Sequence, residues 1–344
     1  MASYPLNNSP LYSDNRYGKA IEIVYSSVLN NTIQPSNFGW PISLVRTMTI
    51  KSIDAKKYYG MDIGTATVLK ELGRGSMAVV FEGYQRTLKR KIAVKILPKV
   101  LMTQSAAERF QQEAEAAAIL SHPNIIPIYE VGETDEFLFM SMQLVQGKDL
   151  LAYIKKAKKN VIPSRRVLPL VPTFNVVIHV LGALGYAHGQ GIVHRDIKPP
   201  NILIEAHSRR PLISDFGTAR FVRGDELGKE LILGTPLYMA PEQIATTDVD
   251  GRADIYAVGV MLFQMVVEKL PFEHYSSMMA LLAHKQKDPK GIFLKKPSQL
   301  NAHLHESLDR IIGKAMAYDP EKRFSTCSEL IQALKWYRKN HLKG

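Results

Sequence analysis

The sequence predicts an α+β protein in which a small part rich in β-strands precedes a larger, mainly helical part. Between residues 68 and 145, short runs of β-branched and apolar residues are separated by glycine and polar residues, a pattern typical of strands. After Gly147 the apolar residues recur at helical spacing over longer stretches. The 344 residues, 46% of them hydrophobic, suffice for one large two-part unit with an extension, or for two ordinary domains.

The strand-like runs are rich in β-branched or aromatic residues and occupy 68–72, 79–84, 92–97, 125–131 and 137–145. Between the third and fourth runs, Ser105 and Glu108 form a capping box that predicts the start of a helix. Glu113 lies on the same face of that helix as three apolar residues. A buried carboxylate needs a partner, because burying it alone is costly, and Lys95 is the partner we expect.

Longer apolar patterns predict helices over 176–187, 254–267, 278–284, 306–317 and 328–339. The most apolar stretch, Ile255 to Val267, contains Gln264 and is too short to cross a bilayer. It is therefore predicted as a central helix buried on all sides. No run approaches a membrane span and no signal pattern opens the chain. A soluble, cytoplasmic protein is expected unless the chain is a piece of a longer receptor.

The net charge of +12 raises the question of an anionic partner such as nucleic acid or a membrane surface. The basic residues are dispersed, however, and clusters such as 155–159 carry no array of stacking aromatic residues. Solvated surface is the favoured interpretation, with docking of an acidic protein substrate as its rival. No nucleic-acid partner is expected.

The single cysteine, Cys327, excludes an internal disulfide and fits a reducing compartment. It lies inside a capping-box pattern formed by Thr326 and Glu329. We therefore predict that Cys327 is a small buried residue at the start of a helix and has no redox role.

The most specific motif is the run His-Arg-Asp-Ile-Lys-Pro-Pro-Asn at residues 194–201, followed by Asp-Phe-Gly at 215–217. It places a carboxylate at Asp196, a lysine at 198, and oxygen donors at Asn201 and Asp215. A loop that transfers a phosphoryl group needs these parts, because a carboxylate must orient the acceptor hydroxyl and a metal ion must neutralise the triphosphate. Asp-Phe-Gly alone is common by chance, but the eight-residue run with a second motif at this distance is not.

On these motifs the chain resembles the eukaryotic-type protein kinase family, and most of all its bacterial members. Further landmarks of that family occur in the expected order at residues 72–80, 93–95, 113, 122–124, 240–242, 254–259 and 319–323. The resemblance covers about residues 63–340 and implies a bilobal kinase fold with an N-lobe at 63–145 and a C-lobe at 146–340. Residues 1–62 are an extension of unknown structure. Glu242 and Arg323 are expected to form a buried, architectural ion pair.

The resemblance also implies an ATP site. The glycine-rich loop over the phosphates would comprise Leu72, Gly73, Arg74, Gly75, Ser76, Met77, Ala78, Val79 and Val80, where Ala78 replaces the third glycine of the usual pattern. Lys95 would contact the α and β phosphates while paired with Glu113. The residues expected around the adenine and ribose are Leu72, Val80, Ala93 and Leu203, the gatekeeper Met142, the Gln143 carbonyl, the Val145 amide and Asp149.

For catalysis, the resemblance implies that Asp196 accepts the hydroxyl proton and that Lys198 stabilises the transferring phosphoryl group, with Lys95 and Asn201 completing the catalytic set. Asn201 and Asp215 would hold magnesium, or manganese in its place. A lysine at position 198 is typical of serine/threonine kinases, not of tyrosine kinases. Proteins with serine or threonine acceptors are therefore the expected substrates.

Arg195 occupies the position that usually meets a phosphate on the activation segment. Residues 219–234 contain no Ser, Thr or Tyr, so this switch is not expected in its usual place. Two alternatives remain equally open. Asp225, Glu226 or Glu230 supplies a standing negative charge to Arg195, or Arg195 bonds only backbone or solvent.

A chain with these motifs could have three functions: an active protein kinase, a pseudokinase that serves as an ATP-binding scaffold, or a kinase of small molecules or lipids. A pseudokinase would be expected to lack Lys95, Asp196, Asn201 or Asp215, and all four are present. A small-molecule kinase would carry a different catalytic loop. The sequence therefore predicts an active serine/threonine protein kinase in bacterial signalling, with no indication of its oligomeric state.

Overall fold

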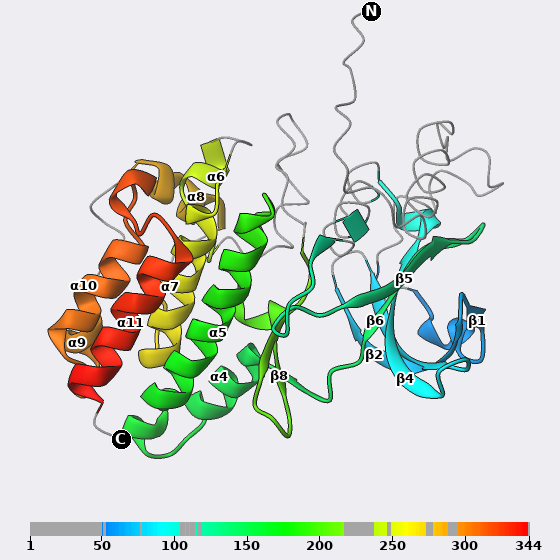
Figure 1. Cartoon of the computed structure of the whole chain (residues 1–344), viewed down its shortest axis with the longest axis horizontal. Coiled ribbons are helices and arrows are strands. Elements are labelled where there is room, and N and C mark those ends of the chain that lie inside the picture. Colours follow the sequence, from blue (N-terminus) through cyan, green and yellow to red (C-terminus); the bar gives the residue numbers. More distant parts are fainter. Residues whose placement is uncertain are drawn as a thin grey trace, which may run out of the picture. The chain divides into compact units, whose positions relative to one another are not determined.

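The computed structural model describes residue 50 and residues 53–75, 78–103, 119–216, 237–245, 249–272, 278–287 and 295–342, together with positions 107, 110, 114 and 115. The chain forms two compact units. Unit 1 comprises Met1–Ala107 and Ile128–Ser141, and unit 2 comprises Glu108–Pro127 and Met142–Gly344. Figure 1 shows strands in the first and mainly helices in the second, as the α+β prediction requires.

Unit 1 is organised around a six-stranded sheet with the order β1-β2-β3-β4-β6-β5. The strands are β1 (Asp62–Ile63), β2 (Ala66–Arg74), β3 (Val79–Gln85), β4 (Arg90–Pro98), β5 (Ile128–Glu133) and β6 (Phe137–Gln143). Strands β2, β3 and β4 pair antiparallel in chain order, which short turns permit. All three contain the runs predicted for them. The run predicted from residue 125 forms a strand only from Ile128, and Ile125 makes an isolated bridge to Ile213.

The buried hydrophobic cluster of unit 1 includes residues upstream of this sheet. The short 3-10 helix η3 (Ala55–Tyr58) begins after Asp54, whose side chain accepts a hydrogen bond from the Lys56 backbone. Its Tyr58 ring is buried, with its centroid 5.5 Å from that of Phe81 and 5.7 Å from that of Phe137. Aromatic pairs at this distance stabilise a core beyond their buried area. Part of the segment assigned to the extension therefore packs as an integral piece of unit 1.

Unit 2 combines helices with a small three-stranded sheet of order β7-β8-β9. Its strands are β7 (Gly147–Asp149), β8 (Ile202–Glu205) and β9 (Pro211–Ile213). Its α-helices are α4 (Leu150–Lys158), α5 (Leu170–Gly189), α6 (Glu242–Ala245), α7 (Arg252–Val266), α8 (Met278–Lys287), α9 (Pro297–Leu300), α10 (Glu306–Ala315) and α11 (Cys327–His341). Short 3-10 helices are η4 (Lys99–Leu101) in unit 1, and η5 (Pro163–Arg165), η6 (Pro199–Asn201) and η9 (Pro320–Lys322) in unit 2.

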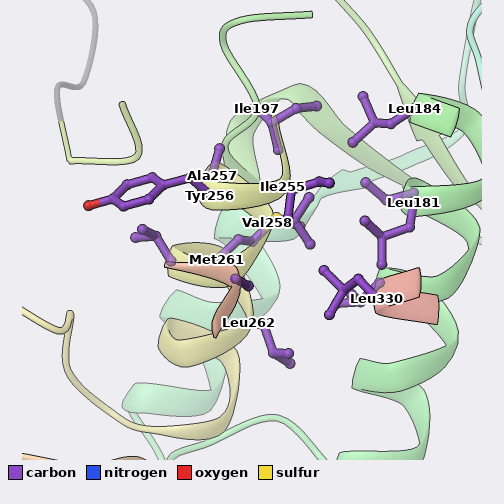
Figure 2. Packing of buried hydrophobic residues seen from close by; sticks show 14 of the residues in the cluster. Leu181, Leu184, Ile197, Ile255, Tyr256, Ala257, Val258, Met261, Leu262 and Leu330 are labelled. Atoms are coloured by element: carbon purple, nitrogen blue, oxygen red, sulfur yellow. The ribbon is translucent and has the colours of Figure 1, made fainter. Parts of the chain in front are cut away.

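Helix α7 is the centre of unit 2, as its apolar sequence predicts. All of its residues from Ala253 to Val266 are buried, which leaves it without a polar face. Figure 2 shows Ile255 and Val258 of α7 in the space between this helix and Leu181 and Leu184 of α5. These side chains belong to one buried cluster, to which α11 adds Leu330.

Helix α5 is an exception to the expectation that no stretch approaches a membrane span. By length and composition alone, residues Pro163–Gly189 are apolar enough to cross a membrane. One such helix is weak evidence, because the core helices of soluble proteins pass the same test. Here Phe174, Val177, Leu181 and Leu184 are fully buried in the core of unit 2, and 39% of the most apolar 18-residue window is buried.

Candidate active site

The loop of residues 194–201 brings three predicted catalytic side chains together. It runs from α5 to β8 and ends in η6. Lys198 Nζ donates to both carboxylate oxygens of Asp196, at 2.9 and 2.7 Å. Asn201 Nδ2 donates to the Asp196 backbone oxygen at 2.8 Å and to its Oδ2 at 3.1 Å. The Asp196 carboxylate is thus held from two sides, while 26% of its side chain remains exposed to accept a substrate.

The β8–β9 hairpin places Asp215 beside this loop. Ile202 and Ile213 are partners across the two strands, so the residues that flank the pair are neighbours. The Ser214 amide donates to the Asn201 carbonyl at 3.0 Å, and its hydroxyl donates to Asp215 Oδ2 at 3.2 Å. Asp215 has a left-handed backbone with φ of 59°, which is uncommon for a residue with a side chain and frequent at functional sites.

Asn201 and Asp215 offer a donor set that suits magnesium. The Asn201 amide nitrogen is engaged by Asp196, which leaves its Oδ1 as the oxygen that could face a cation. A carboxylate and an amide oxygen, completed by phosphate oxygens and water, are the ligands that magnesium prefers. The residues present therefore fit the predicted ion.

A buried carboxylate on α7, that of Asp254, holds the catalytic loop by hydrogen bonds to its backbone. Asp254 accepts hydrogen bonds from the backbone amides of His194 at 3.0 Å and Arg195 at 2.8 Å, and from His188 Nε2 at 2.8 Å. Burial acts to raise the pKa of Asp254, but the hydrogen bond from His188 and the nearby histidine charges outweigh it and hold that pKa below its usual range. Asp254 fixes the turn at Arg195, whose φ is 64°.

Sequence reasoning matched Asp254 as a family landmark but missed this role. A signal was available, because a carboxylate in a helix without a polar face must find partners. The prediction that Glu113 pairs with Lys95 rests on this same need of a carboxylate on an apolar face for a partner, and there the family pattern also marks the residue. His188 carried no comparable signal, since a lone histidine near a helix end has many ordinary roles.

His194 joins the two catalytic motifs. Its Nε2 lies 3.0 Å from the Ser214 carbonyl, and its ring packs edge-on against Phe216 at a centroid distance of 4.6 Å. Its Nδ1 accepts the Asp196 amide at 3.2 Å. On the other side of the loop, Gln243 of α6 donates from Nε2 to the Arg195 carbonyl at 2.9 Å. Hydrogen bonds and ring packing therefore connect the loop to residues 214–216, to α6 and to α7.

In unit 1, the strands align predicted phosphate-binding residues. Gly73 of β2 is the partner of Val80 of β3, which in turn is the partner of Lys95 of β4. The Gly75 amide donates to the Ala78 carbonyl at 2.8 Å. A Cβ added at Gly73 would meet no atom of the described residues within 4 Å. Packing there does not demand glycine, whereas close approach of the backbone to a phosphate does.

The other predicted nucleotide residues lie in ordinary secondary structure. In unit 1, Leu72 is exposed, Val79 and Ala93 are buried, and Ala93 pairs with Glu82 across β3 and β4. In unit 2, Leu203 of β8 is the partner of Asp149 of β7. Asp149 Oδ1 accepts the Ala152 amide at 2.8 Å and caps α4, so this predicted ribose ligand has a structural role as well.

Near the ends of β6, the Gln143 amide donates to the Pro127 carbonyl at 3.1 Å, and Val145 is half-buried in the following loop. Several predictions lie outside the described residues. These are the roles assigned to Ser76, Met77, Glu113, Asp225, Glu226 and Glu230.

The expected architectural ion pair is confirmed. The Arg323 guanidinium, which is fully buried, donates to the two Glu242 carboxylate oxygens at 2.6 and 2.7 Å. Arg195 Nη2 lies 3.5 Å from the Val249 carbonyl, the outer limit for a hydrogen bond. This contact does not decide between the two alternatives for Arg195.

Comparisons with known proteins agree with this geometry. The chain is 33% identical over 285 residues to the serine/threonine-protein kinase Pkn3 of Myxococcus xanthus, covering 80% of this chain and 50% of that protein. It is 33% identical over 275 residues to the serine/threonine-protein kinase PknF of Mycobacterium tuberculosis, covering 78% and 55%. The chain thus spans about half the length of these curated relatives.

A solved structure shows the same fold. The crystal structure of a double mutant of the Mycobacterium tuberculosis PknI kinase domain aligns with a TM-score of 0.64 and 29% identity, covering 80% of this chain and 97% of that chain. The family model described as the protein kinase domain matches residues 66–336. With the predicted catalytic loop assembled and this match over most of its length, the chain belongs to the protein kinase domain family.

Proposed function

We propose that this protein is an ATP-dependent serine/threonine protein kinase that phosphorylates protein substrates in bacterial signalling. One observation carries the proposal: the Asp196 carboxylate is held by Lys198 and Asn201 and remains partly exposed. Such a carboxylate can accept a hydrogen bond from a hydroxyl and aim the oxygen at a phosphorus atom. The names of the relatives support the serine/threonine class.

In the proposed reaction, the acceptor oxygen forms a bond to the γ-phosphorus while the bond from that phosphorus to the β–γ bridging oxygen breaks. ADP leaves, and the hydroxyl proton passes to Asp196. Lys198 stabilises negative charge on the phosphoryl oxygens. Magnesium, held by Asn201 and Asp215, would neutralise charge on the phosphates. Asp254 acts through the loop, since it fixes the backbone at His194 and Arg195.

The nucleotide residues are proposed on the same footing. Lys95 would bind the α and β phosphates, paired with Glu113, and the backbone around Gly73 and Gly75 would approach the phosphates closely. The remaining assignments for adenine and ribose are those given by the family resemblance: Leu72, Val80, Ala93, Gln143, Val145, Asp149 and Leu203.

The alternative is a pseudokinase that binds ATP without turnover. Nothing in the chain favours it, because the lysine, carboxylates and asparagine that pseudokinases lose are present. We further propose that the kinase domain works in the cytoplasm, where ATP is available and where its free, buried Cys327 would stay reduced. Proteins with serine or threonine acceptors are its proposed partners.

The test is to incubate the purified protein with labelled ATP, magnesium and a degenerate peptide library containing serine, threonine and tyrosine acceptors. Label should enter serine and threonine and should be lost when a chelator removes the metal. Asp196→Asn should lower transfer by about 10²–10⁴-fold, the usual contribution of general acid–base catalysis, with nucleotide affinity nearly unchanged. Transfer by this variant at the wild-type rate would contradict the assignment, and ATP binding without turnover by the wild type would favour the pseudokinase.

A further inference from the structure

Ile50 and residues 53–58 lie upstream of the matched family domain and yet are built into unit 1. The family model begins at residue 66. Ile50, Ile53, Ala55 and Tyr58 are all buried, in the same cluster as the strands of the sheet. The inner surface of this segment is therefore apolar and packed. Its backbone carbonyls at Ile50 and Ile53 face a charged group described next.

Arg74 connects this segment to the sheet. Its Nη1 donates to the Ile50 carbonyl at 2.9 Å and to the Ile53 carbonyl at 2.6 Å. Its Nε and Nη2 donate to the two carboxylate oxygens of Glu71 at 2.7 and 2.9 Å. The planar guanidinium thus bonds three acceptor groups at once, two backbone carbonyls and one carboxylate, a geometry that lysine cannot reproduce. The hydrogen bond from Arg74 also lowers the pKa of Glu71, which keeps the carboxylate ionised.

The position of Arg74 in the chain extends this connection to the glycine-rich loop. Arg74 stands between Gly73 and Gly75, at the end of β2, and its partner across the hairpin is Val79. It is therefore a backbone member of the loop assigned to the nucleotide phosphates, although its side chain is directed to the upstream segment. Glycines on both sides leave the backbone free to move, so the side chain of Arg74 is the natural place to restrain it.

A second contact strengthens the link. The Glu71 amide donates to the Tyr59 hydroxyl at 3.2 Å, so the chain just after η3 also bonds β2. Ile50, Ile53 and Tyr59 therefore contact β2 at Glu71 and Arg74, on the approach to the glycine-rich loop.

We propose that Ile50 and residues 53–59 act as a clamp on the glycine-rich loop, with Arg74 as the positioning residue that transmits the state of this upstream segment to nucleotide binding. The inference deepens the proposed function and rests on it for the identity of the nucleotide. A seated clamp holds the β2 end of the loop in one conformation. A released clamp lets the loop sample several, and ATP must then select among them, which weakens binding. Anything that binds or displaces the upstream segment would thereby change ATP affinity.

The key variant is Arg74→Lys, which keeps the positive charge but loses the planar fork. Arg74→Lys loses hydrogen bonds made by a charged group, and each such bond stabilises the folded arrangement by about 1.5 kcal/mol or more. If this stabilisation restrains the glycine-rich loop, its loss should weaken binding of a non-hydrolysable ATP analogue about tenfold. Hydrogen exchange should become faster both at 53–59 and at 73–80. The KM for ATP should rise while the KM for a peptide substrate stays the same. Glu71→Gln should produce a smaller change of the same sign, because it weakens only one side of the fork.

The matched control is Arg86→Lys on the same sheet. Arg86 pairs with Asp62 and donates to the Thr67 hydroxyl at 3.0 Å, and neither of these partners belongs to the clamp or to the glycine-rich loop. This control should leave analogue affinity unchanged and should leave exchange at 73–80 as slow as in the wild type.

The clamp is overturned if Arg74→Lys frees residues 53–59 while analogue affinity and exchange at 73–80 stay at wild-type values. Equal effects of Arg74→Lys and Arg86→Lys would also overturn it, since the change would then reflect the sheet as a whole. Failure of the proposed function looks different: the wild type would bind the analogue but transfer no phosphate. Binding and exchange need no turnover, so the clamp would still be tested.

Discussion

The two loops that carry the kinase motifs are held in different ways. In unit 2, the loop of residues 194–201 is fixed by side chains from other elements, above all by buried Asp254. In unit 1, the glycine-rich loop rests on strand pairing, the turn bond from Gly75 to Ala78, and Arg74, whose side chain is 25% exposed. The groups proposed to act on the acceptor hydroxyl are thus anchored in a core. The loop proposed to cover the phosphates can adjust, as segments with fewer buried contacts generally do.

The largest effect should come from Asp254→Asn, which attacks the anchored loop. Asparagine keeps the size but offers one acceptor oxygen where three donors converge. Breaking a buried ionic network of this kind should lower the free energy of unfolding by about 3–5 kcal/mol. A displaced catalytic loop should lower the rate of phosphoryl transfer by about a hundredfold or more. Urea unfolding and a transfer assay on the same preparation measure both.

Asp250→Asn is the matched control. Asp250 lies near the start of the same helix, but its side chain is 56% exposed and pairs with Arg252 at the surface. Exposed pairs of this type contribute about 1 kcal/mol or less. A loss as large as that of Asp254→Asn would show that the effect belongs to the helix start and not to the buried carboxylate.

A buried lysine supports a second backbone segment of unit 2 and gives a pH-dependent test. Lys285 Nζ donates to the carbonyls of Leu237 and Met239, both at 2.8 Å, and lies 4.4 Å from the centre of the Phe272 ring. Burial lowers the pKa of Lys285 to about 7. In an unfolded chain the amine titrates near pH ~10.4. Between these values the unfolded state binds more protons, so stability must rise with pH.

We therefore expect Lys285 to make the free energy of unfolding increase by on the order of 1 kcal/mol per pH unit between about pH 7 and about pH 9. Below about pH 7 both states are protonated and this contribution is constant. Lys285→Met removes the amine and should flatten the slope in that window. Denaturant unfolding of both proteins across the window measures the difference, and parallel slopes would mean that the amine stays charged in the fold.

On the glycine-rich loop, Gly73→Ala distinguishes an effect on ligand binding from an effect on packing of the fold. A Cβ at Gly73 meets no described atom within 4 Å, so the fold should tolerate alanine. If the backbone there approaches a phosphate, the methyl group should weaken ATP binding about tenfold, which corresponds to ~1.4 kcal/mol. Gly182→Ala on α5 is the control, since its Cβ is equally unobstructed among the described residues. It should raise stability by ~0.5–1 kcal/mol and leave ATP binding alone.

The smallest effect is expected at Cys327, which lies behind the anchored loop. Burial raises the pKa of its thiol, and its Sγ is 3.7 Å from His188 Nδ1. Despite this histidine, a thiol without solvent access should react with iodoacetamide only after unfolding. Mass measurement after alkylation with and without denaturant tests this. Rapid labelling of the native protein would mean that the region around Asp254 opens more easily than the comparison implies.

The elements that the sequence predicted well are those with a long pattern or a specific motif. The apolar run of α7 predicted its complete burial, and residues 194–201 predicted the assembly around Asp196. Strands β1, β7, β8 and β9 were not predicted, because two to four residues are too few for a periodic pattern to emerge. Helix α5 begins at Leu170, six residues before its predicted start, since a proline at 172 is tolerated in a first turn.

Among functional residues, the motif members were predictable and their supports were not. Asp254 and Arg74 both sit inside recognised motifs, yet their partners are 59 and 24 residues away in the chain. Sequence spacing carries no information on such distant pairs. The same limit explains why Tyr58 and its neighbours were left in an extension of unknown structure.

The apolar character of α5 has a consequence during protein synthesis. Its buried face is covered by α7 and α11, and α11 begins 138 residues after α5 ends at Gly189. At ~5–20 residues per second, a ribosome needs roughly 7–28 s to complete that interval. Until α11 has been made, part of a helix with the hydropathy of a membrane span stays exposed on the nascent chain. This kinase domain should therefore depend on a co-translational chaperone, and slow translation downstream of α5 should increase its aggregation.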